Sequence, residues 1–252
     1  MVRLAKTFQK SMKGYRDDPF ALDMAKELWN NGIAFSFDEM SRMYDTLSVK
    51  LTKGKVVWGT HEARDVCSRV DALAKKVMNC ADGDACINLE ELKLARDWKM
   101  IRSRVRPSWS ELDKNDNDQV VRSTTEAYRL LDGGDWKAAL LCMTATKGDT
   151  NIHGVGPATA SLVLALRDRS VPFFGEEAVR IAIPNSGTSY KYDMREYEEY
   201  IKVMRGKVEE MGGGLTAWEV ERALWAAVYE EEEEKEEVEE VEGKAAKKRK
   251  KR

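Results

Sequence analysis

The segment from Ile152 to Leu166 combines two glycines, a proline and an aliphatic run in an order that restricts the local backbone. Gly154 and Gly156 lie one residue apart, which allows a tight turn with positive φ and leaves the backbone bare. Pro157 suits the first position of a helix, where its missing N–H costs nothing, and the alanines and leucines after it are strong helix formers. We therefore expect a helix that begins at a glycine turn with unpaired N–H groups, which is an arrangement suited to an anion.

A helix expected over residues 136–146, with Asp135 as its cap, completes a pair of helices around this turn. The pair, residues 136–168, resembles a helix-hairpin-helix, the module that holds one DNA strand through its phosphates without reading bases. The resemblance implies DNA contacts at the turn and at the start of the second helix, by Gly154, Val155, Gly156 and Thr159. A purely structural turn is the alternative, because most Gly-x-Gly connections between helices bind nothing.

Apolar residues recur at helical spacing through most of the chain, and strand-like alternation is almost absent. With 252 residues, 42% of them hydrophobic and 34% charged, the chain can bury a core beneath a helix-rich surface. The expected fold is all-α, with a basic arm at 1–18, a helical domain at 19–229 and an acidic-then-basic tail at 230–252. A tail of this composition stays disordered or forms a solvated helical extension. Helices are expected at 19–30, 37–53, 60–80, 88–106, 123–132, 136–146, 157–168, 193–211 and 216–228.

The charge balance requires any basic face to be local. Outside the tail the chain carries 34 acidic and 34 basic residues, whereas affinity for duplex DNA depends heavily on neutralising phosphates. Lys99, Arg102 and Arg106 fall at helical spacing and could form such a face beside Trp98. The alternative interpretation places Trp98 in the core and lets the cations favour the negative end of their helix dipole.

Metal, cofactor and membrane chemistry are not indicated by the sequence. The four cysteines show no Cys-x-x-Cys repeat and the chain has only two histidines, so we expect reduced thiols, no metal and no cofactor. Counted from Asp82 or from Asp113, the sixth position of an EF-hand loop is not glycine, so the acidic stretches at 82–84 and 113–118 are interpreted as solvated turns. No apolar run approaches the roughly 20 residues that cross a bilayer. Because the first residues also lack a signal peptide, an intracellular protein is expected.

A proline turn delivers two carboxylates to the start of another expected helix, where Glu176 and Glu177 follow residues 171–175. A helix N-terminus stabilises glutamates whatever their function. Together with the hairpin, however, this turn resembles the helix-hairpin-helix superfamily of DNA glycosylases. The resemblance places Glu176 at the catalytic aspartate of that superfamily, with Glu177 in reserve. Ala158 stands where bifunctional members carry a nucleophilic lysine, so only a monofunctional glycosylase is implied.

Over a longer span the chain resembles an uncharacterised, largely fungal family of eukaryotic proteins of this type. The shared features are the Trp98-Lys99 helix with its Arg106-Pro107 end and the segments 154–161, 171–174 and 220–225. This resemblance implies an all-α, glycosylase-like fold without an established activity.

From these observations we expect a monomeric protein that binds DNA without sequence specificity, in the context of DNA repair. A monofunctional DNA glycosylase using Glu176 is one alternative, and a non-enzymatic nuclear scaffold whose acidic tail docks a protein partner is the other. The basic cluster at 244–252 is a candidate nuclear-import signal or nucleic-acid patch. It favours a nuclear location, although a fortuitous basic tail is the alternative.

Overall fold

The computed structural model describes residues 23–31, 56–57, 61–102, 107–144, 150–184, 190–212 and 214–228. Several predicted features lie outside these residues: the basic arm 1–18, the helix at 37–53, Arg106 and the charged tail 230–252.

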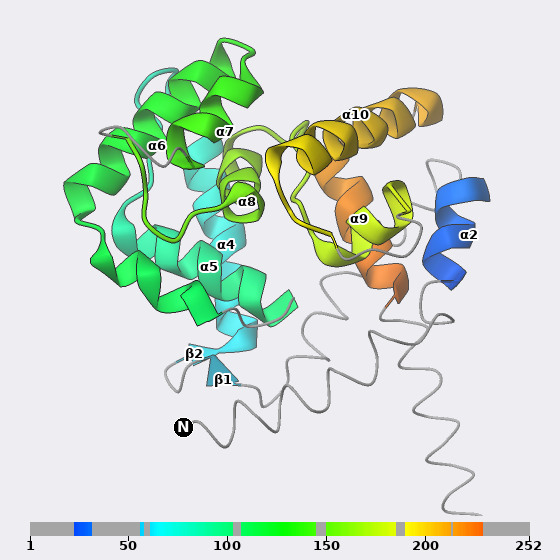
Figure 1. Ribbon diagram of the computed structural model, residues 1–252, viewed down its shortest axis with the longest axis horizontal. Helices are drawn as coiled ribbons and strands as arrows, with labels where there is room; N and C mark the ends of the chain where they lie inside the picture. Colours follow the sequence, from blue (N-terminus) through cyan, green and yellow to red (C-terminus); the bar gives the residue numbers. More distant parts are fainter. Residues whose placement is uncertain are drawn as a thin grey trace, which may run out of the picture.

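The described chain is built almost entirely from helices, which confirms the all-α prediction. Within these residues the exception is a short antiparallel pair, β1 and β2, in which Val57 lies opposite His61. In chain order the elements are α2 (Asp23–Asn31), β1 (Val56–Val57), β2 (His61–Glu62), α4 (Ala63–Met78), α5 (Leu89–Arg102), the 3-10 helix η2 (Pro107–Lys114), α6 (Asn117–Asp132), α7 (Trp136–Thr144), α8 (Pro157–Arg167), α9 (Glu176–Ala182), α10 (Met194–Met211) and a helix at 217–228 (Figure 1).

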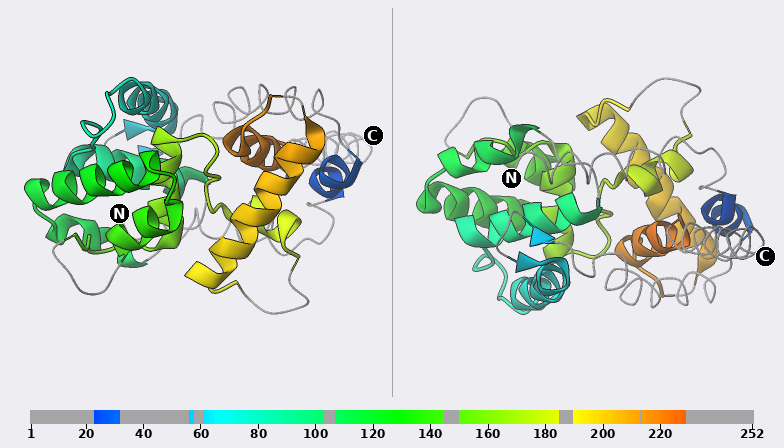
Figure 2. Two further views of the ribbon diagram at one scale, coloured as in Figure 1. Left: turned by 90° about the horizontal axis from the view of Figure 1, so that it is seen from above. Right: turned by 90° about the horizontal axis from the view of Figure 1, so that it is seen from below.

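The helices gather into two groups that lie side by side. Helices α4 to α8 form one group, and α2, α9, α10 and the 217–228 helix form the other, as Figure 2 shows from above and below. Helix α8 is the centre of the first group and packs against α4, α5, α6 and α7. Each residue from Thr159 to Leu166 is buried. A helix buried on all sides must be apolar on all sides, which explains the aliphatic run after the glycine turn.

Local capping signals place several helix starts where the sequence predicts them. The Asp135 carboxylate accepts a hydrogen bond from the Ala138 amide at 2.8 Å before α7. Asp193 caps α10 by accepting from the Glu196 amide at 3.0 Å. At the 217–228 helix, Thr216 and Glu219 form the reciprocal hydrogen bonds of a capping box.

The predicted start of α6 is wrong. The spacing of Ser123 and Glu126 suggested a capping box, but α6 begins at Asn117 and is capped by Asp116, which accepts from the Gln119 amide at 2.7 Å. The Ser123 hydroxyl instead donates to the Gln119 carbonyl inside the helix. The stretch 113–118, interpreted as a solvated turn, therefore contains a helix start.

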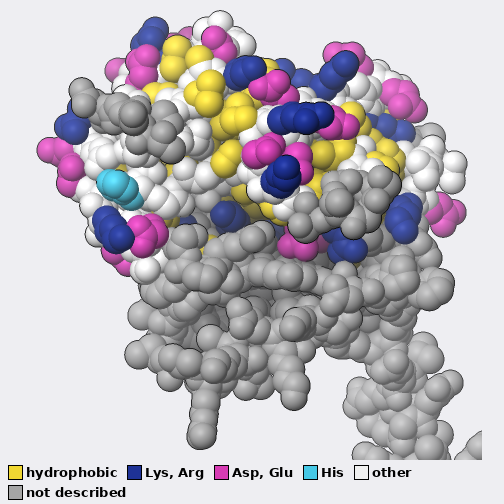
Figure 3. Space-filling view, viewed as in Figure 1, with side chains coloured by type: hydrophobic (Ala, Val, Ile, Leu, Met, Phe, Trp, Pro, Cys, Tyr) yellow, Lys and Arg dark blue, Asp and Glu magenta, His cyan; other side chains and the backbone are white. Residues whose placement is uncertain are grey.

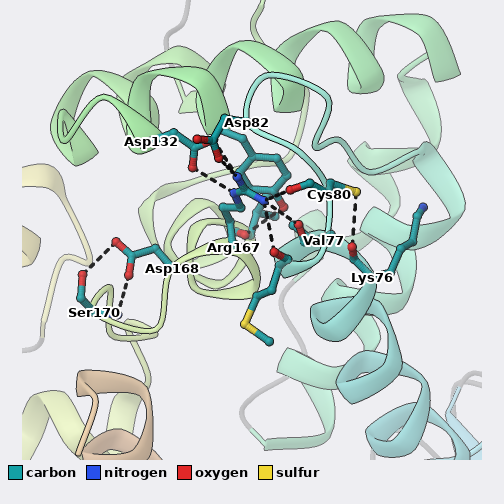
Figure 4. A network of polar contacts seen from close by, with 11 residues as sticks. Lys76, Val77, Cys80, Asp82, Asp132, Arg167, Asp168 and Ser170 are labelled. Carbon is teal, nitrogen blue, oxygen red and sulfur yellow. Dashed lines mark hydrogen bonds and ion pairs between the residues drawn. The ribbon is translucent and has the colours of Figure 1, made fainter. Parts of the chain in front are cut away.

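Arg167, the last residue of α8, joins three helix ends in the first group (Figure 4). Its guanidinium donates at 2.9 Å to the carbonyls of Val77 and Cys80 at the end of α4. It also binds both carboxylate oxygens of Asp132 at 2.9 Å, at the end of α6, and Asp82 at 2.8 Å. A single side chain thus satisfies carbonyls that a helix C-terminus leaves without intrahelical partners.

Candidate functional site

The glycine turn before α8 has the backbone that the sequence predicts at Gly154, where φ is +78°. Gly156 differs, because it has the extended φ of −103° and serves as the N-cap of α8, with Pro157 directly after it. The turn is anchored by two buried apolar residues, Ile152 and Val155. The amide of Ile152 donates to Met143 at 3.2 Å, which ties the turn back to α7. His153, Gly154 and Gly156 form its exposed tip.

The segment from η2 to α6 holds one side of this turn. The buried Asn115 side chain accepts from the His153 amide at 2.7 Å and donates to the His153 carbonyl at 3.0 Å. The Gln119 side-chain amide donates to the Asn151 carbonyl. A Cβ atom on Gly154 would lie 2.9 Å from the Cβ of Glu111, so only glycine allows this close approach.

These contacts reduce the number of open amides below what the sequence suggested. The His153 amide is used by Asn115, and the Val155 amide donates to the Ile152 carbonyl at 3.2 Å. At Gly154 and Gly156 the amides have no hydrogen-bond acceptor among the described residues, and Gly156, as the N-cap of α8, has no side chain to cap the first amides of the helix. An anion at this tip would therefore meet two glycine amides together with the positive end of the α8 dipole.

Lys99 and Thr159, both predicted to contact DNA, are brought together at the start of α8. The Lys99 ammonium on α5 donates to the Thr159 hydroxyl at 2.8 Å. Because Thr159 is only 4% exposed, the half-buried lysine is the member of this pair that reaches the surface. A cation beside the positive end of a helix dipole raises the local positive potential, which favours an anion there.

Arg102 contradicts its predicted role as a DNA contact. It is 2% exposed and forms a bidentate ion pair with Glu221, with nitrogen–oxygen distances of 3.0 and 2.7 Å. Glu221 is 0% exposed, and burial raises the pKa of its carboxyl while Arg102 lowers it. Helical spacing placed Arg102 on one face with Lys99, but that part of the face turns into the interior between the two helix groups. Arg106 lies outside the described residues.

Aromatic rings enclose this ion pair. The Arg102 guanidinium lies 4.5 Å from the ring centre of Trp98 and 5.0 Å from that of Trp225. Trp98 stacks on Trp218 at 5.6 Å, and the guanidinium of Arg169 lies 4.4 Å from the ring centre of Trp218. Trp98 is therefore a core residue, as the alternative interpretation of the sequence has it, and the stack joins α5 to the 217–228 helix.

Residues 171–175, which deliver the predicted catalytic carboxylates, are held in place by hydrogen bonds from both sides. The Ser161 hydroxyl on α8 accepts from the Phe174 amide at 3.0 Å. On α10, the hydroxyls of Tyr197 and Tyr200 donate to the carbonyls of residues 172 and 173 at 3.2 and 3.0 Å. Burial raises the pKa of both tyrosines, so both stay protonated and keep donating.

Glu176 and Glu177 open α9 next to the buried ion pair. Glu176 is half-buried at the helix start, whereas Glu177 is 7% exposed and points into the protein. Their N-cap, Gly175, has no room for a side chain, because its Cβ atom would lie 2.6 Å from a carboxylate oxygen of Glu221. The reserve role predicted for Glu177 would therefore require its side chain to leave the interior.

A groove of about 480 Å³ lies between the two helix groups, where α8 ends. Trp136 and Leu215 contribute apolar lining, and Asp168, Ser170 and Arg205 contribute polar groups. Arg205 donates to the carbonyl and hydroxyl oxygens of Ser170 at 3.2 and 3.3 Å, which fixes these two lining residues relative to each other. Glu176 is not among the lining residues.

Lys and Arg side chains alternate with Asp and Glu on the face drawn in Figure 3 instead of forming a patch of one sign. Any DNA contact there is therefore local, as the charge balance suggests. No disulfide joins the four cysteines, all of which fall in the described ranges. Among the described residues, no cluster of His, Cys, Asp and Glu has the make-up of a metal site. No helix in these ranges is both long enough and apolar enough to cross a bilayer.

Sequence reasoning missed Asn115, Ser161, Tyr197, Tyr200 and Glu221 as parts of this region. Tyr197 and Tyr200 fall within the helix expected at 193–211, and their three-residue spacing on one helix face was visible in the sequence. Comparison with known proteins adds no further site residues: no family model matches the chain, and neither a curated protein nor a solved structure gives a significant match.

Proposed function

We propose that the protein binds DNA through the sugar–phosphate backbone, without sequence preference, at the tip of the α7–α8 hairpin. The observation that carries the proposal is the exposed pair of glycine amides at residues 154 and 156, placed at the start of α8. Amides and the Lys99 ammonium would contact phosphate oxygens only. Phosphate contacts position a protein on DNA but carry no sequence information directly.

Gly156 gives the sharpest test of this proposal. Its backbone is extended and a Cβ atom there meets nothing within 4 Å, so Gly156→Leu fits the fold and places a bulky side chain at the exposed tip. Hydrogen bonds to charged groups contribute about 1.5–3 kcal/mol, so we expect a loss of about 10- to 100-fold in affinity. Replacing Gly154 would be less clear, because its positive φ and the nearby Glu111 would distort the turn.

Fluorescence anisotropy with a short labelled duplex of mixed sequence measures this effect. Gly206→Leu is the matched control, because Gly206 is exposed on α10 and also has open space around it. Lys99→Met should weaken binding and reduce the dependence on salt by about one phosphate contact, whereas Lys202→Met on α10 should not. If the wild-type protein leaves the duplex unbound at low salt, or Gly156→Leu binds as tightly as wild type, the proposal is wrong.

The fixed position of residues 171–175 supports a second candidate, a monofunctional DNA glycosylase that uses Glu176. Three hydrogen bonds hold the backbone just before this carboxylate, and catalysis requires such precise placement. A carboxylate can stabilise the positive charge that builds on the sugar when the glycosidic bond breaks. Excision should be measured on a panel of damaged bases with wild type and Glu176→Gln. Equal product from both proteins would exclude Glu176 as the catalyst.

The nuclear location and the protein partners expected from the tail 230–252 stay predictions.

A further inference from the structure

An exposed ion pair stands directly beside the glycine turn. Glu111 of η2 approaches Gly154 so closely that a Cβ atom on the glycine would lie 2.9 Å from the Cβ of Glu111. Three residues later, the Lys114 ammonium binds the Glu111 carboxylate at 2.6 Å. Both side chains are well exposed, at 62% for Lys114 and 40% for Glu111. The turn therefore has Lys99 on the α5 side and Lys114 on the η2 side.

Two carboxylates next to Glu111 in the sequence have other partners. Asp113 forms an ion pair with Lys93 at 3.3 Å, and Asp116 caps α6. Glu111, whose Cβ atom adjoins Gly154, borders the open tip, and Lys114 is the cation that neutralises it. An exposed ion pair of this kind contributes little to stability, so Lys114 can leave Glu111 for another anion with little loss of stability.

We infer that Lys114 is a second phosphate contact of the hairpin and that Glu111 competes with the DNA for it. On binding, a backbone phosphate at the Gly154 and Gly156 amides takes the place of the Glu111 carboxylate as the partner of Lys114. In the free protein the Glu111 carboxylate takes the place of the phosphate beside Lys114. Glu111 therefore lowers the affinity for DNA, because it pairs with the lysine and repels the strand. This inference rests on the proposed DNA binding at the same tip.

The test compares wild type with Glu111→Gln, Lys114→Met and the double variant, using the short labelled duplex over a range of salt concentrations. Removing one exposed charge close to a phosphate should change affinity by about two- to fivefold. Glu111→Gln should therefore tighten binding by that factor, and the gain should shrink as salt screens the charges. Lys114→Met should weaken binding and lower the slope of log affinity against log salt by about one.

The double variant separates a phosphate contact from simple neutralisation of Glu111. If Lys114 binds the phosphate, the double variant binds about two- to fivefold more weakly than Glu111→Gln alone. If Lys114 only neutralises Glu111, those two proteins bind equally, and the inference is overturned. A Glu111→Gln variant with wild-type affinity would overturn it as well.

Glu126 and Arg129 on α6 provide a closely matched control. They form an ion pair of the same spacing at 2.7 Å, with exposures of 39% and 60%. Glu126→Gln and Arg129→Met should leave DNA binding unchanged, which shows that net charge alone does not cause the effect. If the wild-type protein binds the duplex but substitutions at residues 111 and 114 have no effect, only this inference is refuted. Wild type that does not bind refutes the proposed function and this inference with it.

Discussion

Substituting one partner of the buried Arg102–Glu221 ion pair should destabilise the protein strongly, whereas replacing both partners with apolar residues should change its stability little. Removing one partner leaves an uncompensated charge among the aromatic rings, and such a change costs about 3–5 kcal/mol in free energy of unfolding. We therefore expect Arg102→Met and Glu221→Met to destabilise the protein by that amount each. For a chain of this size the loss corresponds to a decrease in Tm of about 5–20 °C.

The double variant should recover most of this stability. With both charges removed, the desolvation cost disappears, and apolar replacements of buried pairs are often neutral or stabilising by about 1–4 kcal/mol. Methionine suits the site because its thioether packs well against aromatic rings, and the guanidinium lies within 5.3 Å of three ring centres. The expected coupling energy is therefore of the same order as the effect of either single substitution.

Urea unfolding followed by far-ultraviolet circular dichroism gives the free energies of all four proteins. The m-values should agree, because a change in m would mean that the compactness of the denatured or native state has changed or that unfolding is no longer two-state. A loss below about 1 kcal/mol in either single variant would show that the pair is not held as described. A double variant as unstable as the sum of the two single losses would refute the argument from desolvation.

Three further predictions concern stability. Burial raises the pKa values of Tyr128, Tyr197 and Tyr200, so their contribution to stability is complete below pH about 10. Above that pH the free energy of unfolding should fall by up to about 4 kcal/mol per pH unit for the three together. Phenolate absorbance should show these three tyrosines ionising only when the protein unfolds, and ionisation of all eight tyrosines in the folded protein would contradict this. Arg167→Met should lower the free energy of unfolding by about 1–3 kcal/mol, because helix-end carbonyls and the Asp132 carboxylate lose their hydrogen-bond donor. Urea denaturation showing a loss below about 0.5 kcal/mol would be incompatible with the network. Gly175→Ala should cost about 1–3 kcal/mol, because its Cβ atom would lie 2.6 Å from a buried carboxylate oxygen; an unchanged Tm would show that the contact can relax.

The parts of the fold that could be predicted depend on signals close in sequence. Asp135 and Asp193 each cap a helix through an amide three residues later, so both starts were visible. The start of α6 was not, because Asp116 and Ser123 both have capping side chains and only packing decides between them. The turn at Gly154 was predicted from residue types alone, since few other residues adopt a positive φ.

The parts of the candidate site that could not be predicted depend on contacts distant in sequence. Lys99 and Arg102 share a helix face by spacing, yet one reaches the start of α8 and the other is buried against Glu221, 119 residues away. Periodicity identifies a face but not what covers it. Asn115 was equally hidden, because its bonds to His153 span 38 residues.

The link from α5 to the 217–228 helix limits how the hairpin can be studied in isolation. Lys99 stands one helical turn before Arg102, so the carboxylate on the last described helix anchors the same helix that carries the lysine to the α8 entrance. A fragment ending before residue 214 would keep every residue of the hairpin but lose that anchor. The proposed DNA-binding tip therefore depends on both helix groups together, and the hairpin excised as a minimal module should be a poorly folded peptide.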